Sequence, residues 1–303
     1  MIAVKNYKFW FCTGSQDLYG DECLAHVAEH SGIIVDSLNK SGILPYEVVW
    51  KPTLITNELI RRTFNEANAD EECAGVITWM HTFSPAKSWI LGLQEYRKPL
   101  MHFHTQFNQE IPYDTIDMDF MNENQSAHGD REYGHMVTRM GIERKVIVGH
   151  WSDEKVVGRI AAWMRTAVGI MESSHVRVAR FADNMRNVAV TEGDKVEAQM
   201  KFGWEVDAYP VNELCEYVKA VPKGDITALL DEYYSKYTIL LEGRDPEEFK
   251  RHVAVQAQIE AGLEKFLVEK DYHAIVTHFG DLGELQQLPG LAIQRLMEKG
   301  YGF

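Results

Sequence analysis

His102 and His104 stand two residues apart in an apolar segment of the sequence, PLMHFHT. If this segment is a strand, both imidazoles lie on one face, because side chains alternate between the two faces of a strand. A pair of imidazoles at this spacing suits a divalent metal ion, since neutral imidazole is a common ligand. Buried histidines that hydrogen-bond to backbone groups are at least as common, so a structural role is favoured over metal ligation.

Polar and aromatic residues gather where the apolar segments end. The stretches at these ends are GSQDLYG, HTFSPAK, HTQFN, GHW, ADNMR and THFGD. In an open parallel sheet, ligands bind at the carboxyl ends of the strands. Amides and imidazoles hydrogen-bond to hydroxyl groups, and aromatic faces pack against C–H groups. The sequence therefore predicts a polyhydroxylated ligand, such as a sugar, at this edge.

Three other motifs predict no ligand of their own. GSQDLYG lacks both the G-x-G-x-x-G pattern and a P-loop lysine, so a nucleotide is not expected, and a glycine-bracketed turn is the alternative. The acidic segment DTIDMDFMNENQ lacks calcium-loop spacing, which favours a helix N-terminus with solvated acids. The methionines near this segment are expected to be packing residues: Met118, Met121, Met136 and Met140.

Strands and helices alternate along the whole chain. Strands are expected at residues 7–14, 46–50, 73–80, 99–105, 145–151, 176–182, 204–210 and 272–279. Helices are expected at residues 23–42, 57–70, 86–97, 193–203, within 211–266, and at 288–299, with a long polar stretch over 106–129. Such repeated β-α units predict an α/β fold with parallel sheets and helices on both faces. We expect two doubly wound domains, at residues 1–175 and 176–303.

Composition limits the classes of partner. The chain has 303 residues, which favours two domains over a single core. Its formal net charge of −14 argues against nucleic acids and anionic membranes, and it has no run of 18 apolar residues that would cross a bilayer. The N-terminus shows no signal-peptide cleavage site. The four cysteines are scattered, which predicts reduced thiols in the cytoplasm: Cys12, Cys23, Cys73 and Cys215.

The chain ends with an amphipathic helix over Leu288–Lys299, which Gly300 is expected to close. The two aromatic residues that follow, Tyr301 and Phe303, are neither a polar tail nor a complete element. We expect them to begin a strand or loop that is buried.

Several long motifs, in order, carry a family resemblance. They include FCTGSQDLYG, WMHTFSPAKSW, HFHTQFN, DMDFMNENQSAHGDREYG, RFADNMRNVAVTEGDKVEAQMKFG and QLPGLAIQRLMEKGYGF. Together they resemble L-arabinose isomerase from about residue 7 to residue 303, with a looser match over residues 238–256. The resemblance implies a cytoplasmic homo-oligomer that converts L-arabinose to L-ribulose with a divalent metal, usually Mn²⁺, and D-galactose to D-tagatose as a second conversion to test. The fold implied is that of L-fucose isomerase: two α/β domains followed by a β-rich domain.

The same resemblance places the family's metal ligands, two glutamates and two histidines, beyond the GYGF segment. We therefore expect a middle domain truncated at its end, no β-rich C-terminal domain, no tightly bound metal, and weak or no activity from this chain alone. The reaction needs a polarised carbonyl and a proton shuttle, which a metal and a carboxylate supply. The alternative is a metal-free sugar-binding and oligomerisation module. A periplasmic-type sugar receptor is a weaker third reading, because it would need a signal peptide.

By matching position, seven residues resemble the family's substrate-lining residues: Gln16, Leu18, Phe83, Gln125, His128, Met185 and Phe279. The two glutamines and His128 would hydrogen-bond to hydroxyl groups, and the aromatic residues and Met185 would supply apolar walls. Some of the seven could instead only anchor loops, and Leu18 and Met185 are the weakest assignments. No catalytic residue and no metal ligand is assigned.

The family's pocket is shared between subunits, which implies that the N-terminal pocket residues lie near an interface. The aromatic residues Trp79, Phe83 and Trp89 fit an exposed interface, though they fit a core equally well. Donors that could form a replacement metal site are His81, His102, His104, His128, Asp117 and Glu132. We expect no ordered transition metal on them, because an effective site also needs outer groups that orient its ligands.

Overall fold

The computed structural model describes residues 5–303, which form two compact units, at residues 5–171 and 172–303. The division falls inside helix α6 (Glu154–Ser173). The boundary between residues 175 and 176 that the sequence suggested stays a prediction. No helix among the described residues has the length and apolar character needed to cross a membrane.

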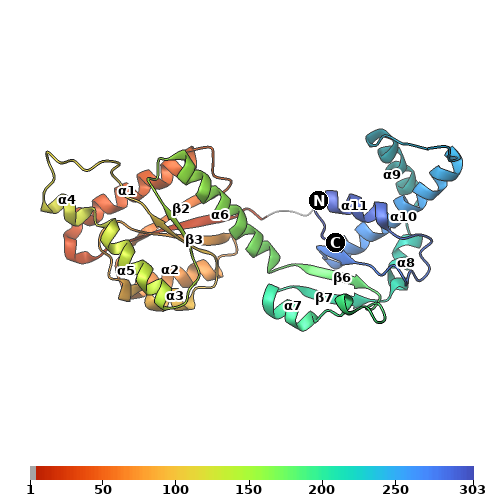
Figure 1. The fold of residues 1–303 in the computed structure, drawn as a ribbon, viewed down its shortest axis with the longest axis horizontal. Helices are drawn as coiled ribbons and strands as arrows, with labels where there is room; N and C mark the ends of the chain where they lie inside the picture. The colour runs from red at the N-terminus through yellow and green to blue at the C-terminus, as the bar shows by residue number, and fades with distance from the viewer. Residues whose placement is uncertain (1–4) are drawn as a thin grey trace. The chain divides into compact units, whose positions relative to one another are not determined.

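The first unit contains a five-stranded parallel sheet in the order β2-β1-β3-β4-β5 (Figure 1). The strands are β1 (Lys8–Gly14), β2 (Glu47–Leu54), β3 (Cys73–Met80), β4 (Leu100–His104) and β5 (Lys145–Val148). The connecting elements are the short 3-10 turns η1 (Asp17–Tyr19) and η2 (Ala86–Trp89), with the helices α1 (Gly20–Lys40), α2 (Asn57–Ala69), α3 (Ile90–Glu95), α4 (Met118–Glu123), α5 (Ser126–Arg139) and α6. The expected parallel α/β architecture is confirmed.

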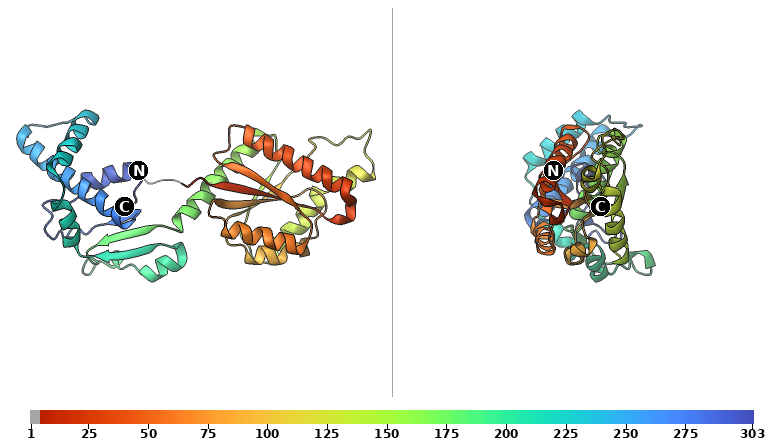
Figure 2. Two further views of the ribbon diagram at one scale, coloured as in Figure 1. Left: turned by 180° about the vertical axis from the view of Figure 1, so that it is seen from behind. Right: turned by 90° about the vertical axis from the view of Figure 1, so that its left-hand side faces the viewer.

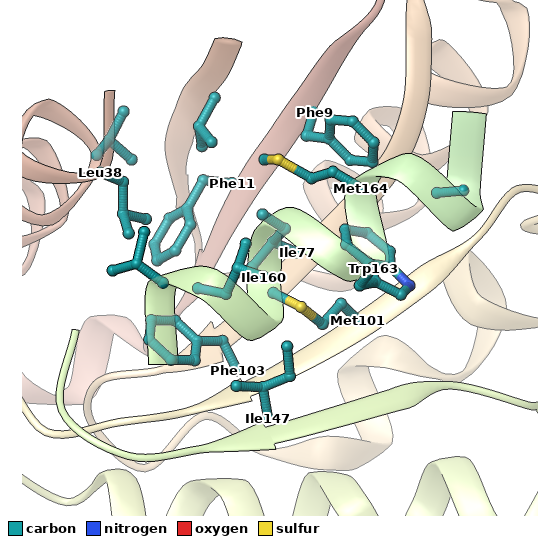
Figure 3. Packing of buried hydrophobic residues seen from close by; sticks show 14 of the residues in the cluster. Phe9, Phe11, Leu38, Ile77, Met101, Phe103, Ile147, Ile160, Trp163 and Met164 are labelled. Carbon is teal, nitrogen blue, oxygen red and sulfur yellow. The ribbon is translucent and has the colours of Figure 1, made fainter. Parts of the chain in front are cut away.

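Side-chain alternation along the strands produces two separate cores in this unit. On β1, Phe9 and Phe11 face one core, while Trp10 and Cys12 face the other. Figure 3 shows the first core, in which Phe9 and Phe11 pack with residues of α1 and α6, among them Leu38 and Trp163. Helices α2, α3 and α5 contribute to the second core. The sheet is therefore covered on both faces, and the left view of Figure 2 shows it between α1 on one side and α2 and α3 on the other.

Two tryptophans belong to these cores and not to an exposed surface. Trp79 is fully buried, and its Nε1–H donates to the carbonyl oxygen of Thr105 at 2.9 Å. Trp89 is fully buried as well, and its Nε1–H donates to Ser84 Oγ at 3.0 Å. The interface role considered for both side chains is wrong, because a satisfied indole N–H lets a tryptophan occupy a core.

Helices α5 and α6 lie in segments where no helix was expected. The apolar residues of α6 recur at helical spacing, for example Val157, Ile160, Met164 and Val168, all buried, so its signal was present in the sequence. Helix α5 is mostly polar and buries only two large side chains, Tyr133 and Val137, so its apolar residues give only a weak helical pattern. The helix expected at residues 86–97 is shorter than predicted, because η2 occupies its first part.

The second unit contains a three-stranded parallel sheet in the order β7-β6-β8. Its strands are β6 (Arg177–Phe181), β7 (Glu205–Tyr209) and β8 (Ala274–Val276), the last much shorter than the expected residues 272–279. Its helical elements are η3 (Ala189–Thr191), α7 (Lys195–Phe202), α8 (Val211–Lys219), α9 (Lys223–Lys236), α10 (Pro246–Lys270) and α11 (Gly290–Glu298). Residues of β6, α8, α10 and α11 form its core.

The C-terminal residues add to the edge of this sheet. Gly302 pairs with Ala274 in a parallel bridge, and its carbonyl oxygen accepts from the N–H of Ile275 at 3.0 Å. Tyr301 is buried in the core of the second unit, as expected. Phe303 is 62% exposed, so the expectation of burial is wrong for this residue.

Candidate functional site

The carboxyl ends of β1, β3 and β4 bring their polar loops together, as the sequence predicted. Ser15 follows β1 and hydrogen-bonds through Oγ to Thr82 Oγ1, after β3, at 2.8 Å. Ser126, at the start of α5, donates from Oγ to the carbonyl oxygen of His81 at 3.3 Å. Segments that are distant in the sequence therefore form one polar edge of the sheet.

A cavity of about 840 Å³ opens beside this edge, and we call it the α4–α5 cavity. Its polar lining includes His104, Gln125, His128 and His150. Its apolar lining includes Ile111, Ile116, Met118, Phe120 and Met121, from α4 and the segment before it. An apolar cavity with a few convergent polar groups is typical of a site for a small organic ligand.

Two of the proposed sugar-lining residues line this cavity, and a third lies against one of them. Gln125 and His128 both line it, and His128 Nδ1 lies 3.4 Å from Gln125 Oε1. The ring of Phe83 lies 4.5 Å from the ring of His128, centroid to centroid. This group combines an amide, an imidazole and an aromatic face, the combination expected for a sugar.

Gln16 and Leu18 are placed differently. Leu18 is 80% exposed and lines a separate pocket of about 400 Å³, which we call the α1–α4 pocket. The other residues that line this pocket are Tyr19, Glu22, Cys23, His26, Asp119, Asn122 and Glu123. Gln16 is half-buried just before η1. Neither side chain lines the α4–α5 cavity.

Met185 and Phe279 belong to the second unit. Met185 lies in the loop after β6, where its N–H donates to Thr191 Oγ1 at 3.2 Å, and Phe279 lies after β8, 64% exposed. Strands β6 and β8 are parallel neighbours, so both loops leave the same edge of the sheet. A common cleft formed by these two loops stays a prediction.

The histidines of β4 share one face, as their spacing predicted, and meet a buried carboxylate. His102 Nε2 lies 2.7 Å from Asp130 Oδ1, and His104 Nε2 lies 3.7 Å from Asp130 Oδ2. Asp130 Oδ1 also accepts from the N–H of Met80 at 3.2 Å. Burial lowers the pKa of His102 to about 4, assisted by Arg144, and burial raises the pKa of Asp130. The His102–Asp130 pair lies next to His104, which lines the α4–α5 cavity.

Other donors considered for a metal have structural roles. Asp117 caps α4, because its Oδ1 accepts from the N–H of Phe120 at 2.8 Å, which confirms the expected helix N-terminus. Glu132 Oε2 accepts from the N–H of Ala86 at 3.0 Å. The four cysteines are free, and burial raises the pKa of Cys73 to about 11, which leaves a protonated thiol.

The sequence analysis missed His30 as a partner of His81. His30 lies in the middle of α1, and its Nδ1 is 2.7 Å from His81 Nε2 and 3.4 Å from Glu123 Oε1. His30 and His81 are 51 residues apart, so no local spacing could reveal the contact. Among the described residues, this is the group of three donors whose geometry suits a metal ion.

Comparison with known proteins places both units in one family. The family model for the L-arabinose isomerase N-terminal domain matches residues 3–175, and the model for the central domain matches residues 177–303. The chain is similar to a Geobacillus stearothermophilus protein named L-arabinose isomerase, with 56% identity over 303 residues, which is 100% of this chain and 61% of that protein. A Halalkalibacterium halodurans protein of the same name is 55% identical over the same shares. The chain thus spans about three fifths of the length of these curated relatives.

Proposed function

The chain belongs to the L-arabinose isomerase family, and we propose that it serves the isomerisation of L-arabinose to L-ribulose, an aldose–ketose conversion. The observation that carries this proposal is the 56% identity with a protein of that name over all 303 residues. D-Galactose, with D-tagatose as its product, is the second substrate to test. The remaining family attributes that we propose are a cytoplasmic location, a role in arabinose catabolism and a homo-oligomeric assembly.

In this proposal, the residues of the α4–α5 cavity bind and orient the sugar. Gln125 and His128 hydrogen-bond to sugar hydroxyl groups, while Phe83 packs against a C–H face of the sugar. His104 adds a third polar group to the cavity, with its Nε2 3.7 Å from Asp130 Oδ2. Gln16, Met185 and Phe279 are proposed as substrate-binding residues by their matching positions alone, and Leu18 is the weakest assignment because it lines the α1–α4 pocket.

The catalytic step of the family uses a divalent cation, which polarises the sugar carbonyl when bound. The described residues that line the α4–α5 cavity do not fit such an ion, because no three of their donors converge there. We therefore assign no catalytic residue and no tightly bound Mn²⁺ to this cavity, and derive no step through the metal. The same observation favours a second candidate function, a metal-free module that binds sugar and assembles with other copies.

Assays on this chain separate the two functions. We expect L-arabinose to bind, measured by calorimetry, and ribulose formation to stay weak or absent with or without Mn²⁺. His128→Ala and Gln125→Ala should each weaken sugar binding by about tenfold, the effect of losing one hydrogen bond to the ligand. His135→Ala, an exposed change on the same helix α5, is the matched control. Unaltered binding in both cavity variants would show that the sugar lies elsewhere, and rapid Mn²⁺-dependent turnover would exclude the second candidate function.

A further inference from the structure

Three potential metal ligands converge at the sheet edge, outside the α4–α5 cavity. His30 comes from the middle of α1, His81 follows β3 directly, and Glu123 is the last residue of α4. Their three ligand atoms, His30 Nδ1, His81 Nε2 and one Glu123 carboxylate oxygen, lie within 4.8 Å of one another. We call these three residues the His–His–Glu cluster.

Three potential acceptor atoms surround a single proton in this cluster. His30 Nδ1 faces both His81 Nε2, at 2.7 Å, and Glu123 Oε1, at 3.4 Å. A neutral imidazole carries one N–H and one lone pair, so a single proton lies between the two rings while the carboxylate offers only acceptors. Burial lowers the pKa of His30, and that of His81 to about 3, which keeps both rings neutral near pH 7. A cation in place of this proton would accept the lone pairs of both rings and of the carboxylate.

Packing holds the ligands in this orientation. His81 is fully buried and stacks on Trp79, with ring centroids 4.4 Å apart and planes 15° apart. His30 stacks on Phe107 at 3.6 Å and 9°. The second carboxylate oxygen of Glu123 lies 3.2 Å from His26 Nδ1, a contact that orients the carboxylate from outside the cluster.

Solvent reaches the cluster from one side. Glu123 and His26 line the α1–α4 pocket, which has a volume of about 400 Å³. The side chains of His30 and Glu123 are 18% and 20% exposed, so a hydrated ion can approach them. The remaining coordination positions would face this pocket and be filled by water.

We propose that the His–His–Glu cluster binds one divalent transition-metal ion of the zinc or cobalt type through two imidazole nitrogens and one carboxylate. This donor set is typical of sites that hold such an ion with three protein ligands and keep a position open. Tetrahedral ligation at the usual zinc–nitrogen distance places the nitrogens roughly 3.3 Å apart, so the partly buried His30 side chain moves by about 0.6 Å. This site differs from the sequence-based expectation of no ordered metal, because the donors named there included His81 but not His30.

The surroundings of His81 limit the affinity of the His–His–Glu cluster for a metal ion. When His81 Nε2 binds the ion, its proton lies on Nδ1, a buried atom with no hydrogen-bond partner among the described residues. Metal-binding histidines usually donate this proton to an outer acceptor, and losing such an acceptor weakens binding by about 10–100-fold. We therefore expect micromolar and not nanomolar affinity for Zn²⁺, and weaker binding of Mn²⁺.

The test is a titration of the full chain with Co²⁺, followed by its visible absorption, and with Zn²⁺ by calorimetry. We expect one ion per chain, competition between the two metals, and a raised unfolding temperature in the presence of Zn²⁺. His30→Asn and Glu123→Gln should each weaken binding by at least about tenfold and abolish the thermal shift. His26→Ala should cause a smaller loss, because it removes only the outer contact to Glu123.

His135→Ala controls for binding to surface histidines, since this side chain is exposed. Circular dichroism in the presence of a chelator tests whether His30→Asn and Glu123→Gln fold as the parent chain does. These two variants are preferred to a change at the fully buried His81. Sub-stoichiometric binding, or folded variants that bind Co²⁺ as tightly as the parent, would overturn the proposal. Neither outcome bears on sugar binding at Gln125 and His128, so the proposed function is tested separately.

Discussion

At the scale of single residues, His102 and Asp130 show how burial sets protonation at the polar edge of the first sheet. The two side chains touch at 2.7 Å, and both are almost fully buried. Burial disfavours charge on either group, so it lowers the pKa of His102 and raises that of Asp130. The Nε2–H of a neutral imidazole can then donate to the carboxyl group and hold its position next to His104.

This pair predicts a pH dependence of stability. The folded pKa of His102, about 4, lies below its unfolded value of 6.5, so the unfolded chain binds more protons between these values. The contribution of His102 to stability is therefore fully present above pH 6.5 and is lost as the pH falls toward about 4, by on the order of 3 kcal/mol. The raised pKa of Asp130 acts in the opposite direction.

Comparing the parent chain with His102→Asn isolates the histidine contribution, because Asn keeps a donor for Asp130 but does not titrate. We expect urea midpoints of the variant to fall less steeply with acidification, although the variant is less stable overall. Equal slopes for the two chains would contradict a neutral buried His102.

At the scale of elements, helices α8 and α10 pack closely together at Gly262. A Cβ added at this position would lie 2.7 Å from Val218 Cα, a backbone atom that cannot move away by a rotamer change. Gly262→Ala should therefore separate the helices and lower the free energy of unfolding by about 1–3 kcal/mol, measured by urea titration. Gly224→Ala on α9 is the control, since an added Cβ there meets no described heavy atom within 4 Å. The control should be neutral or slightly stabilising.

A buried ionic network connects α9, α10 and α11. Arg295 of α11 donates from Nε to Glu260 of α10 at 2.7 Å, and from Nη2 to Glu232 of α9 at 2.6 Å. Glu260 is fully buried and also contacts Lys299 at 2.9 Å and the hydroxyl of Tyr233. A charge in this position is stable only while its partners remain.

Arg295→Met should lower the free energy of unfolding by about 3 kcal/mol, because it leaves the buried Glu260 carboxylate with too few donors. Lys265→Met is the control: it removes an exposed ion pair with Glu269, at 3.7 Å, on α10, the helix that carries Glu260. It should lower the free energy of unfolding by less than about 1 kcal/mol. Similar losses in the two variants, measured by urea unfolding, would mean that the Arg295 network contributes no more than a surface pair.

At the scale of the whole molecule, the proposed shared site predicts that sugar binding depends on assembly. If residues from two copies complete the pocket, diluting the protein below its association range should weaken L-arabinose binding in parallel with the loss of oligomer. Sedimentation velocity and calorimetry over one concentration series measure both quantities. A monomer that binds the sugar as tightly as the oligomer would contradict a shared site.

Most of the local elements and the family were predictable from the amino-acid sequence. The alternation of apolar strands and amphipathic helices fixed the parallel α/β class, and the polar residues after β1, β3 and β4 marked the correct edge of the first sheet. These features were predictable because strand and helix periodicity is a local property. Helix α6 carries the same kind of signal, because its buried apolar residues recur at helical spacing.

The tertiary structure alone decided which distant side chains meet. The strand order β2-β1-β3-β4-β5 places the loop after β3 beside the centre of α1, which brings His81 to His30, and α4 adds Glu123. The same packing buries Trp79 and Trp89, and pairs Gly302 with Ala274. Such contacts depend on strand order and on how helices cover the sheet. The packing free energy of the whole core selects these contacts, and no short segment of the sequence encodes that free energy.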